Sequence, residues 1–207
     1  MPALRLWQLV WLAAAVFVIS AGYGALLPQW QGWLAILSPG ATSTAMSRHI
    51  GFLSGTYTAG VLVGAPLWGM LADRIGLGRV LLIGLVGYVA SLLLMLVPQF
   101  ETLWGIYALR AATGFFVAAV VPVVSALVAE HTPEYQRARR FAWLGAVSLA
   151  GFLIGPALNI VARWAGSWAG GGTSTAALTA QAVIVLSAIF GAVMMLGLAR
   201  TLPERIV

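Results

Sequence analysis

Six long apolar segments, separated by short polar breaks, constrain the fold of this chain more than any other feature of its sequence. A helix needs about 20 residues to cross the roughly 30 Å hydrocarbon core of a bilayer, and each segment comes close to or exceeds that length. The predicted spans cover residues 9–27, 50–72, 80–97, 102–129, 141–162 and 176–199. We therefore predict an all-α membrane protein in which six transmembrane helices form a single domain over residues 1–207.

The composition identifies lipid as the solvent for most of the chain. Hydrophobic residues make up 61% of the 207 residues and charged residues 8%, which is too little polar surface for a water-soluble domain. A secretory signal peptide is a less favoured interpretation of the N-terminal apolar run. The run is long for a signal, and Tyr23, Pro28 and Trp30 continue it as expected for a retained span.

The arginines predict the orientation of the chain in the membrane. Six spans place both termini on one side, and eight arginines flank that side against two on the other. Because arginine accumulates in short cytoplasmic loops, we expect both termini to face the cytoplasm, with the chain in the cytoplasmic (inner) membrane. The eight are Arg5, Arg74, Arg79, Arg137, Arg139, Arg140, Arg200 and Arg205, and the two are Arg48 and Arg163. Despite the net charge of +6, this dispersal argues against a nucleic-acid interface.

The second span carries glycines at Gly55, Gly60, Gly64 and Gly69. Their spacing of four or five residues predicts one smooth stripe for close contact with another helix. Stripes of this kind indicate helix packing more often than a binding site.

The most specific motif is the sequence GMLADRIGLGR between the second and third spans, which begins at Gly69. Gly69 permits close packing, Asp73 can accept hydrogen bonds from amides at a helix end, and Gly76 permits a tight turn. Arg74 and Arg79 can anchor the turn at an anionic leaflet. This order resembles motif A of the major facilitator superfamily, although Leu and Gly follow the second glycine where the family usually has basic residues.

Two further spans carry residues that resemble motifs of the same family. Arg110 and Gly114 in the fourth span resemble motif B. The fifth span resembles motif C, which the family associates with antiporters, but Asn159 stands where a further glycine is usual. The same small residues and proline are also explained by packing and a kink. The motif C residues are Gly151, Gly155 and Pro156.

The resemblance implies the fold of an N-terminal half of such a transporter, built of two inverted three-helix repeats. In the family, two six-helix halves enclose a central cavity. The chain ends soon after the sixth span, where Arg200 to Arg205 resemble the beginning of the family's central loop. The expected partner, besides the bilayer, is therefore a second half, supplied by a homodimer or by a separately encoded chain. A truncated reading frame or a fragment is the remaining alternative.

Arg110 is the only charged residue within the predicted spans. A guanidinium in the bilayer costs several kcal/mol unless it faces protein or water, so Arg110 is a candidate for function. Its planar set of donors suits a carboxylate or phosphate. Tyr23 and Thr113 are the predicted neighbours at a substrate site, because the resemblance places their spans beside the cavity. The alternative is a structural arginine satisfied by backbone carbonyls or polar side chains.

These observations favour secondary-active transport of a small solute, with an anion as one candidate, by alternating access. The alternative is a membrane scaffold or assembly factor that does not transport, or a truncated transporter. No sequence resembles a nucleotide-binding loop or a nucleophile with its base, so neither an enzyme nor a cofactor is predicted. His49 and His131 lack the close spacing of metal ligands, and no cysteine is present. No acidic residue lies within a span to couple transport to protons.

Overall fold

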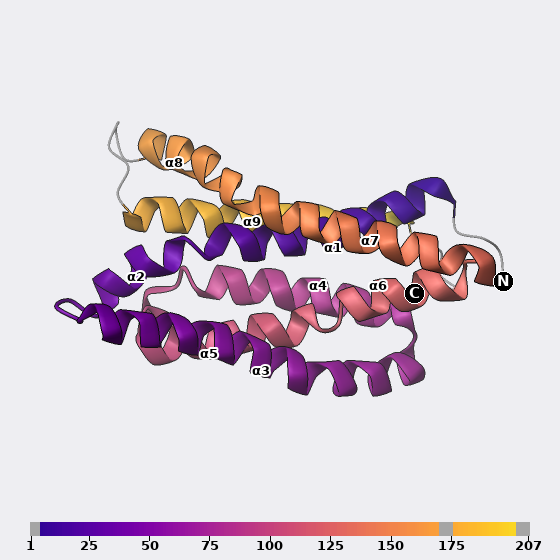
Figure 1. The fold of residues 1–207 in the computed structure, drawn as a ribbon, viewed down its shortest axis with the longest axis horizontal. Helices are drawn as coiled ribbons and strands as arrows, with labels where there is room; N and C mark the ends of the chain where they lie inside the picture. Colours follow the sequence, from indigo (N-terminus) through magenta and orange to yellow (C-terminus); the bar gives the residue numbers. More distant parts are fainter. Residues whose placement is uncertain (1–4, 170–175, 202–207) are drawn as a thin grey trace.

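Six membrane-spanning helices lie side by side along the long axis of the molecule, as Figure 1 shows. The computed structural model describes residues 5–169 and 176–201, where it contains helices and connecting turns. The predicted count of six spans is confirmed. The spans are α1 (Leu6–Leu26), α3 (Ser43–Ile75), α4 (Leu77–Leu94), α5 (Leu103–Val117) with α6 (Val121–Glu130), α7 (Glu134–Ile154) with α8 (Leu158–Ala169), and α9 (Ala176–Thr201). Residues 202–205 of the segment that resembles a central loop, Arg205 among them, lie outside the described residues.

The second and fifth spans begin seven residues earlier than predicted, at Ser43 and Glu134. These first two turns contain polar residues. They are tolerated there because the helix ends extend beyond the hydrocarbon core into the interface. At the start of α3 the Thr42 hydroxyl accepts a hydrogen bond from the Ala45 amide at 3.3 Å, which caps the helix. Hydropathy therefore identifies only the part of each helix that lies within the lipid and misses the turns outside it.

Sequence analysis did not predict α2 (Gln29–Leu37), a short helix between the first two spans. Pro28 precedes its first turn, where a missing amide hydrogen is tolerated. Trp30, Trp33 and Leu34 then bury one face of the helix against the bundle. This short helix becomes part of the candidate site.

Prolines interrupt two of the spans. α6 begins at Val121 with Pro122 in its first turn, and a short 3₁₀ segment, η2 (Gly155–Ala157), contains Pro156 between α7 and α8. A proline lacks the amide hydrogen and clashes with the preceding turn, so each helix is broken there. A further 3₁₀ segment, η1 (Pro98–Phe100), connects α4 to α5.

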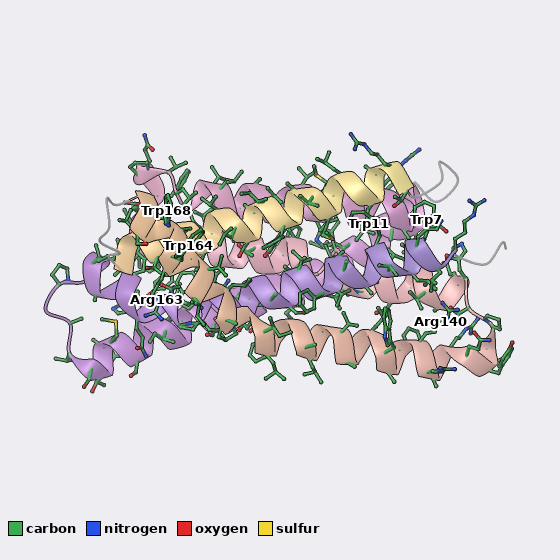
Figure 2. All side chains as sticks on the ribbon, turned by 90° about the horizontal axis from the view of Figure 1, so that it is seen from above. Trp7, Trp11, Arg140, Arg163, Trp164 and Trp168 are labelled. Carbon is green, nitrogen blue, oxygen red and sulfur yellow. The ribbon has the colours of Figure 1, made fainter. Side chains whose placement is uncertain are left out.

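The first span begins and the last span ends at the same end of the six-span bundle. The side-chain amide of Gln8, near the start of α1, donates to the carbonyl of Thr201 at the end of α9 over 3.1 Å. Trp7, Trp11 and Arg140 lie at this end in Figure 2, whereas Arg163, Trp164 and Trp168 lie at the other. Tryptophan and arginine at both ends are typical of the two membrane interfaces.

The packing of the spans repeats after three helices. α1 packs against α7, and α5, three spans later, packs against α3. Likewise α9 packs against α1, and α4 packs against α5. Consecutive spans run in opposite directions, so the two three-helix groups are inverted copies. Figure 1 shows α1, α7, α8 and α9 above α3 to α6.

Glycines allow close contact at two equivalent helix crossings, α3 with α5 and α1 with α7. A Cβ atom added at Gly60 would meet the Ala111 carbonyl of α5, and one added at Gly114 would meet the Tyr57 carbonyl of α3. In the other repeat, Gly151 and Gly155 lie against the backbone of α1, and Gly24 of α1 lies against α7. Close approach of the backbones therefore holds both pairs together.

The prediction of one glycine stripe along α3 was wrong. Gly60 and Gly64 contact α5, whereas added Cβ atoms at Gly55 and Gly69 would meet nothing within 4 Å. A helix turns roughly 100° per residue, which puts the two glycine pairs on opposite faces. The second face of α3, which also carries the exposed Leu62, therefore has no neighbour among the described residues.

The exposed sides of α3 and α7 form two long surfaces without a partner among the described residues. Only 11% of the span in α3 and 17% of that in α7 and α8 is buried, against 56% for α1. The exposed positions on each helix repeat at intervals of three or four residues. One such series consists of Gly51, Gly55, Thr58, Leu62, Ala65 and Gly69 on α3, and another of Ala138, Ala142, Gly145, Leu149 and Phe152 on α7, with further exposed positions beside them.

Candidate functional site

Arg110 lies in the middle of α5 and is 1% exposed. Its guanidinium carbon lies over the rings of Tyr57, Trp30 and Tyr23, at 4.6, 5.0 and 5.4 Å from the ring centroids. These three residues come from α3, α2 and α1 and are called the aromatic cage. Each ring face attracts a cation by about 0.5–2 kcal/mol, so the cage offsets part of the cost of burying the charge.

The glycine of motif B explains how the cage forms. Gly114 follows Arg110 by one helical turn, and its missing side chain lets the backbone of α3 approach at Tyr57. The Tyr57 ring therefore reaches the guanidinium on the same side of α5. Tyr23 packs against Tyr57 with ring centroids 4.8 Å apart, which closes the cage from α1.

The charge of Arg110 has no counter-ion among the described residues. No hydrogen bond or ion pair to its guanidinium occurs in residues 5–169 and 176–201, and the Nε atom is buried without a partner. The Tyr88 hydroxyl is also buried and unpaired. Both residues line a cavity of about 10 Å³ together with Thr113. Because an unpaired buried charge is costly, the site is chemically suited to an anion or a strong hydrogen-bond acceptor.

A cleft of about 270 Å³ lies next to this small cavity. Tyr23 and Tyr57 line both spaces, so the two rings separate Arg110 from the cleft. The Ser20 and Ser148 hydroxyls, also in its wall, are hydrogen-bonded at 2.9 Å between α1 and α7. The cleft is thus lined by aromatic residues and two hydroxyls, and a buried positive charge lies behind one layer of side chains.

The structure brings the three predicted substrate-site residues together. Tyr23 belongs to the aromatic cage, and Thr113 lines the small cavity with Arg110. The Thr113 hydroxyl donates to the Leu109 carbonyl at 2.7 Å, so its hydrogen is used within α5. The predicted alternative is a structural arginine satisfied by backbone carbonyls or by polar side chains of neighbouring spans. Arg110 makes no hydrogen bond of either kind in the described residues, but its guanidinium contacts the rings of Tyr23 and Tyr57, so a structural role stays open.

Sequence reasoning missed Trp30 and Tyr57 as members of the site. Tyr57 precedes the buried Gly60 by three residues and therefore lies on the α5-facing side of α3, a signal that the single-stripe interpretation obscured. Trp30 lies in α2, which at nine residues is too short to be recognised as a membrane span. Its position depends on the change of direction between α1 and α2 at Leu27 and Pro28, which no local pattern predicts.

The motif A residues lie together at the turn between α3 and α4. Gly76 has a φ of 94°, and its amide donates to the Ala72 carbonyl at 2.9 Å, so this turn requires the left-handed region that glycine favours. Asp73, Arg74 and Arg79 are exposed, and the structure gives Asp73 no hydrogen-bond or ion-pair partner among the described residues. Gly69 is likewise open.

The motif C residues lie where α7 ends against α1. Gly151 and Gly155 contact the α1 backbone, and Pro156 lies in η2. Asn159, the departure from the motif, connects the break to the first span. Its side-chain amide donates to the Ala25 carbonyl at 3.1 Å, and its side-chain oxygen accepts from Gln29. This polar contact stabilises the bend at a position where a glycine would make none.

The part of the chain that the structure describes contains no group of three or more side chains that could hold a metal ion. His49 contacts the Tyr107 hydroxyl between α3 and α5, and His131 contacts the Leu127 carbonyl. The two histidines therefore lie in separate environments. The candidate site is defined by Arg110 and the aromatic cage.

Comparisons with known proteins agree with this architecture. The family model of the Major Facilitator Superfamily matches residues 12–206. The class B tetracycline resistance protein of Escherichia coli is 33% identical over 117 residues, which cover 56% of this chain and 28% of that protein. The class H tetracycline resistance protein of Pasteurella multocida is 32% identical over 124 residues, covering 60% and 30%. The quinolone resistance protein NorA of Staphylococcus aureus is 28% identical over 145 residues, covering 70% and 35%. The matched region thus spans about a third of each relative.

Proposed function

This chain belongs to the major facilitator superfamily of membrane transporters, and on that basis we propose that it moves a small anionic solute by alternating access. Membership makes it a multi-pass membrane protein of a transporter family and not of an enzyme family. The solute site in this proposal consists of Arg110, Tyr23 and Tyr57, with Thr113 beside them. The six spans act as one domain.

The main support for the proposal is the charge of Arg110, which has no hydrogen-bond or ion-pair partner among the described residues and is separated from the cleft by Tyr23 and Tyr57. A structural arginine in lipid would gain most from hydrogen bonds to carbonyls, which this residue does not make in the described residues. An anionic group entering from the cleft would supply the missing partner through a planar pair of hydrogen bonds. Movement of the Tyr23 or Tyr57 ring would admit it.

The aromatic cage narrows the class of solute. Tyr23 and Tyr57 line the cleft, and aromatic pairs attract one another by about 0.5–1.5 kcal/mol beyond the area that they bury. A planar aromatic anion would use both the rings and the charge. The names of the similar proteins refer to tetracycline and quinolone resistance, which makes these two drug classes suitable probes.

The transport unit in this proposal contains a second six-helix half. The exposed surfaces of α3 and α7 combine small residues at helical spacing with large apolar side chains such as Leu62 and Leu149, and small residues at this spacing are typical of helix contacts within membranes. The cleft also lies between these two helices, with Tyr57 on one side and Leu149 on the other. A second half would cover both surfaces and close the cleft. It could be a second copy, another chain or a further segment.

Counterflow in liposomes tests the proposed function, because exchange of labelled for unlabelled solute needs no coupling ion. We expect the reconstituted protein to accumulate labelled tetracycline or a labelled quinolone transiently when the lumen is preloaded with the same compound. The detergent-corrected mass of the purified protein should correspond to two six-helix halves. If a protein with the mass of a single half shows counterflow, the proposal that transport needs a second half is contradicted. If a protein of that mass shows no counterflow, the scaffold alternative is favoured.

The orientation is proposed from the arginine distribution, with both termini and the Arg137 hairpin in the cytoplasm. The chain has no cysteine, so single cysteines introduced at Ser38 and Arg137 report on their own sites. In intact cells an impermeant thiol reagent should label the cysteine at Ser38 only, and the one at Arg137 only after permeabilisation. Labelling of both in intact cells would contradict the proposed topology.

We also propose that the motif A residues control the conformational change of transport by contacting the second half. They are Gly69, Asp73, Arg74, Gly76 and Arg79. Asp73 lies on the exposed face of α3 that continues from Gly69, where it can accept hydrogen bonds from helix ends of that half. Asp73→Asn keeps the shape and removes the charge, so counterflow should fall about fivefold at unchanged protein level, as for a loss of about 1 kcal/mol. Loss of the protein from the membrane would instead indicate a structural role.

A further inference from the structure

A second cavity, of about 360 Å³, lies at the arginine-rich end of the bundle between α1 and α7, with α6 behind it. Arg139, Arg140 and Gln136 supply its polar wall. Leu6, Leu9 and Val10 of α1 supply an apolar wall that continues toward the lipid core. The cavity is therefore amphipathic, with its charge at the membrane interface and its apolar wall extending inward.

The cavity opens to the lipid-facing flank and not to the surface that a second half would cover. At roughly 100° per residue, Arg140 and Trp143 lie on the other side of α7 from Ala142 and Gly145. Figure 2 looks onto the flank formed by α1, α7 and α9, where Arg140 lies at the same end as Trp7 and Trp11. The membrane is thus the source of a ligand for this cavity.

The polar wall has an uncompensated positive charge. Neither Arg139 nor Arg140 forms an ion pair among the described residues. Trp143, which is 49% exposed, lies beside them, and tryptophan is favoured at the level of lipid headgroups. Two arginines, an interfacial ring and an apolar wall together complement a phosphate that carries an acyl chain.

We propose that this cavity binds an anionic phospholipid of the cytoplasmic leaflet. The headgroup phosphate accepts hydrogen bonds from Arg139 and Arg140, and one acyl chain lies along Leu6 and Val10. Because each arginine near the surface contributes about 1 kcal/mol to binding of an anionic lipid, phosphatidylglycerol should bind about 30-fold more tightly than phosphatidylcholine of the same acyl chains. The site is separate from the cleft and does not depend on which solute is carried.

Native mass spectrometry of the full chain in a non-ionic detergent, titrated with each lipid, measures this preference. Arg139→Gln with Arg140→Gln should abolish it. Arg163→Gln with Arg200→Gln removes the same charge from exposed positions outside the cavity and should leave it intact. Val10→Trp retains both arginines but fills the apolar wall, so it should also weaken phosphatidylglycerol binding and serves if the double variant does not fold.

Three results would overturn the proposal. The first is a preference for phosphatidylglycerol that survives the Arg139 and Arg140 substitutions. The second is an equal loss in the control variant, which would indicate diffuse charge attraction. The third is displacement of the lipid by millimolar inorganic phosphate, which would identify a site for free anions.

Discussion

Replacing Arg110 by glutamine is expected to reduce counterflow by about tenfold to a hundredfold, while the protein still reaches the membrane. Hydrogen bonds to a charged group contribute about 1.5–3 kcal/mol, and the substitution removes those that Arg110 would form with the solute. Glutamine keeps two donors but loses the positive charge and the planar pair. The measurement is counterflow of a labelled quinolone per unit of reconstituted protein.

The stability of the same variant separates a transport role from a structural one. Arg110→Gln removes a buried charge that has no hydrogen-bond partner among the described residues, so thermal stability in detergent should be maintained. Arg110→Lys keeps the charge but not the planar donors and should transport poorly as well. Arg163→Gln, at an exposed position of α8, is the matched control and should transport normally. An unstable Arg110→Gln protein would favour a structural arginine.

The second large effect is expected at the crossing of α3 and α5. Gly60→Ala places a Cβ atom against the Ala111 carbonyl, and a backbone atom cannot move aside as a side chain can. Overpacking of this kind costs about 1–3 kcal/mol, which for a chain of this length lowers the melting temperature by about 3–10 °C. The measurement is thermal unfolding in detergent.

Gly55→Ala provides the matched control, because an added Cβ atom at Gly55 meets nothing within 4 Å. Its melting temperature should equal that of the unmodified protein. Gly55→Leu should also fold as a single half but weaken association with a second half, seen as a lower detergent-corrected mass. Equal destabilisation by Gly60→Ala and Gly55→Ala would contradict the assignment of the two faces of α3.

The parts of the fold that local chemistry determines were predicted from the sequence. Six apolar segments give six spans because lipid requires continuous apolar helices, and Gly76 gives the turn because only a positive φ fits there. The two faces of α3 were not separated, because hydropathy treats Gly55 and Gly60 alike although one is exposed and the other buried. Tertiary contact with α5 alone distinguishes them.

The candidate site shows the same division. Arg110 stood out because a charge within a span is expensive, and Tyr23 followed from the family resemblance. Tyr57 reaches the guanidinium because Gly114 allows a close crossing, and Trp30 reaches it because the chain changes direction between α1 and α2. The three rings of the aromatic cage come from three different helices, so no pattern within any one helix predicts that they meet at Arg110.

Protection of a single thiol in the cleft tests the central claim, that solute binds in the cleft in front of Arg110. Leu149 lines the cleft and is exposed, and the chain has no cysteine of its own, so Leu149→Cys gives one reporter. Alkylation by N-ethylmaleimide in membranes is measured with and without tetracycline or a quinolone. At least one compound should slow alkylation when Arg110 is present and not in the Arg110→Gln variant. Equal protection in both backgrounds, or none in either, would contradict the claim.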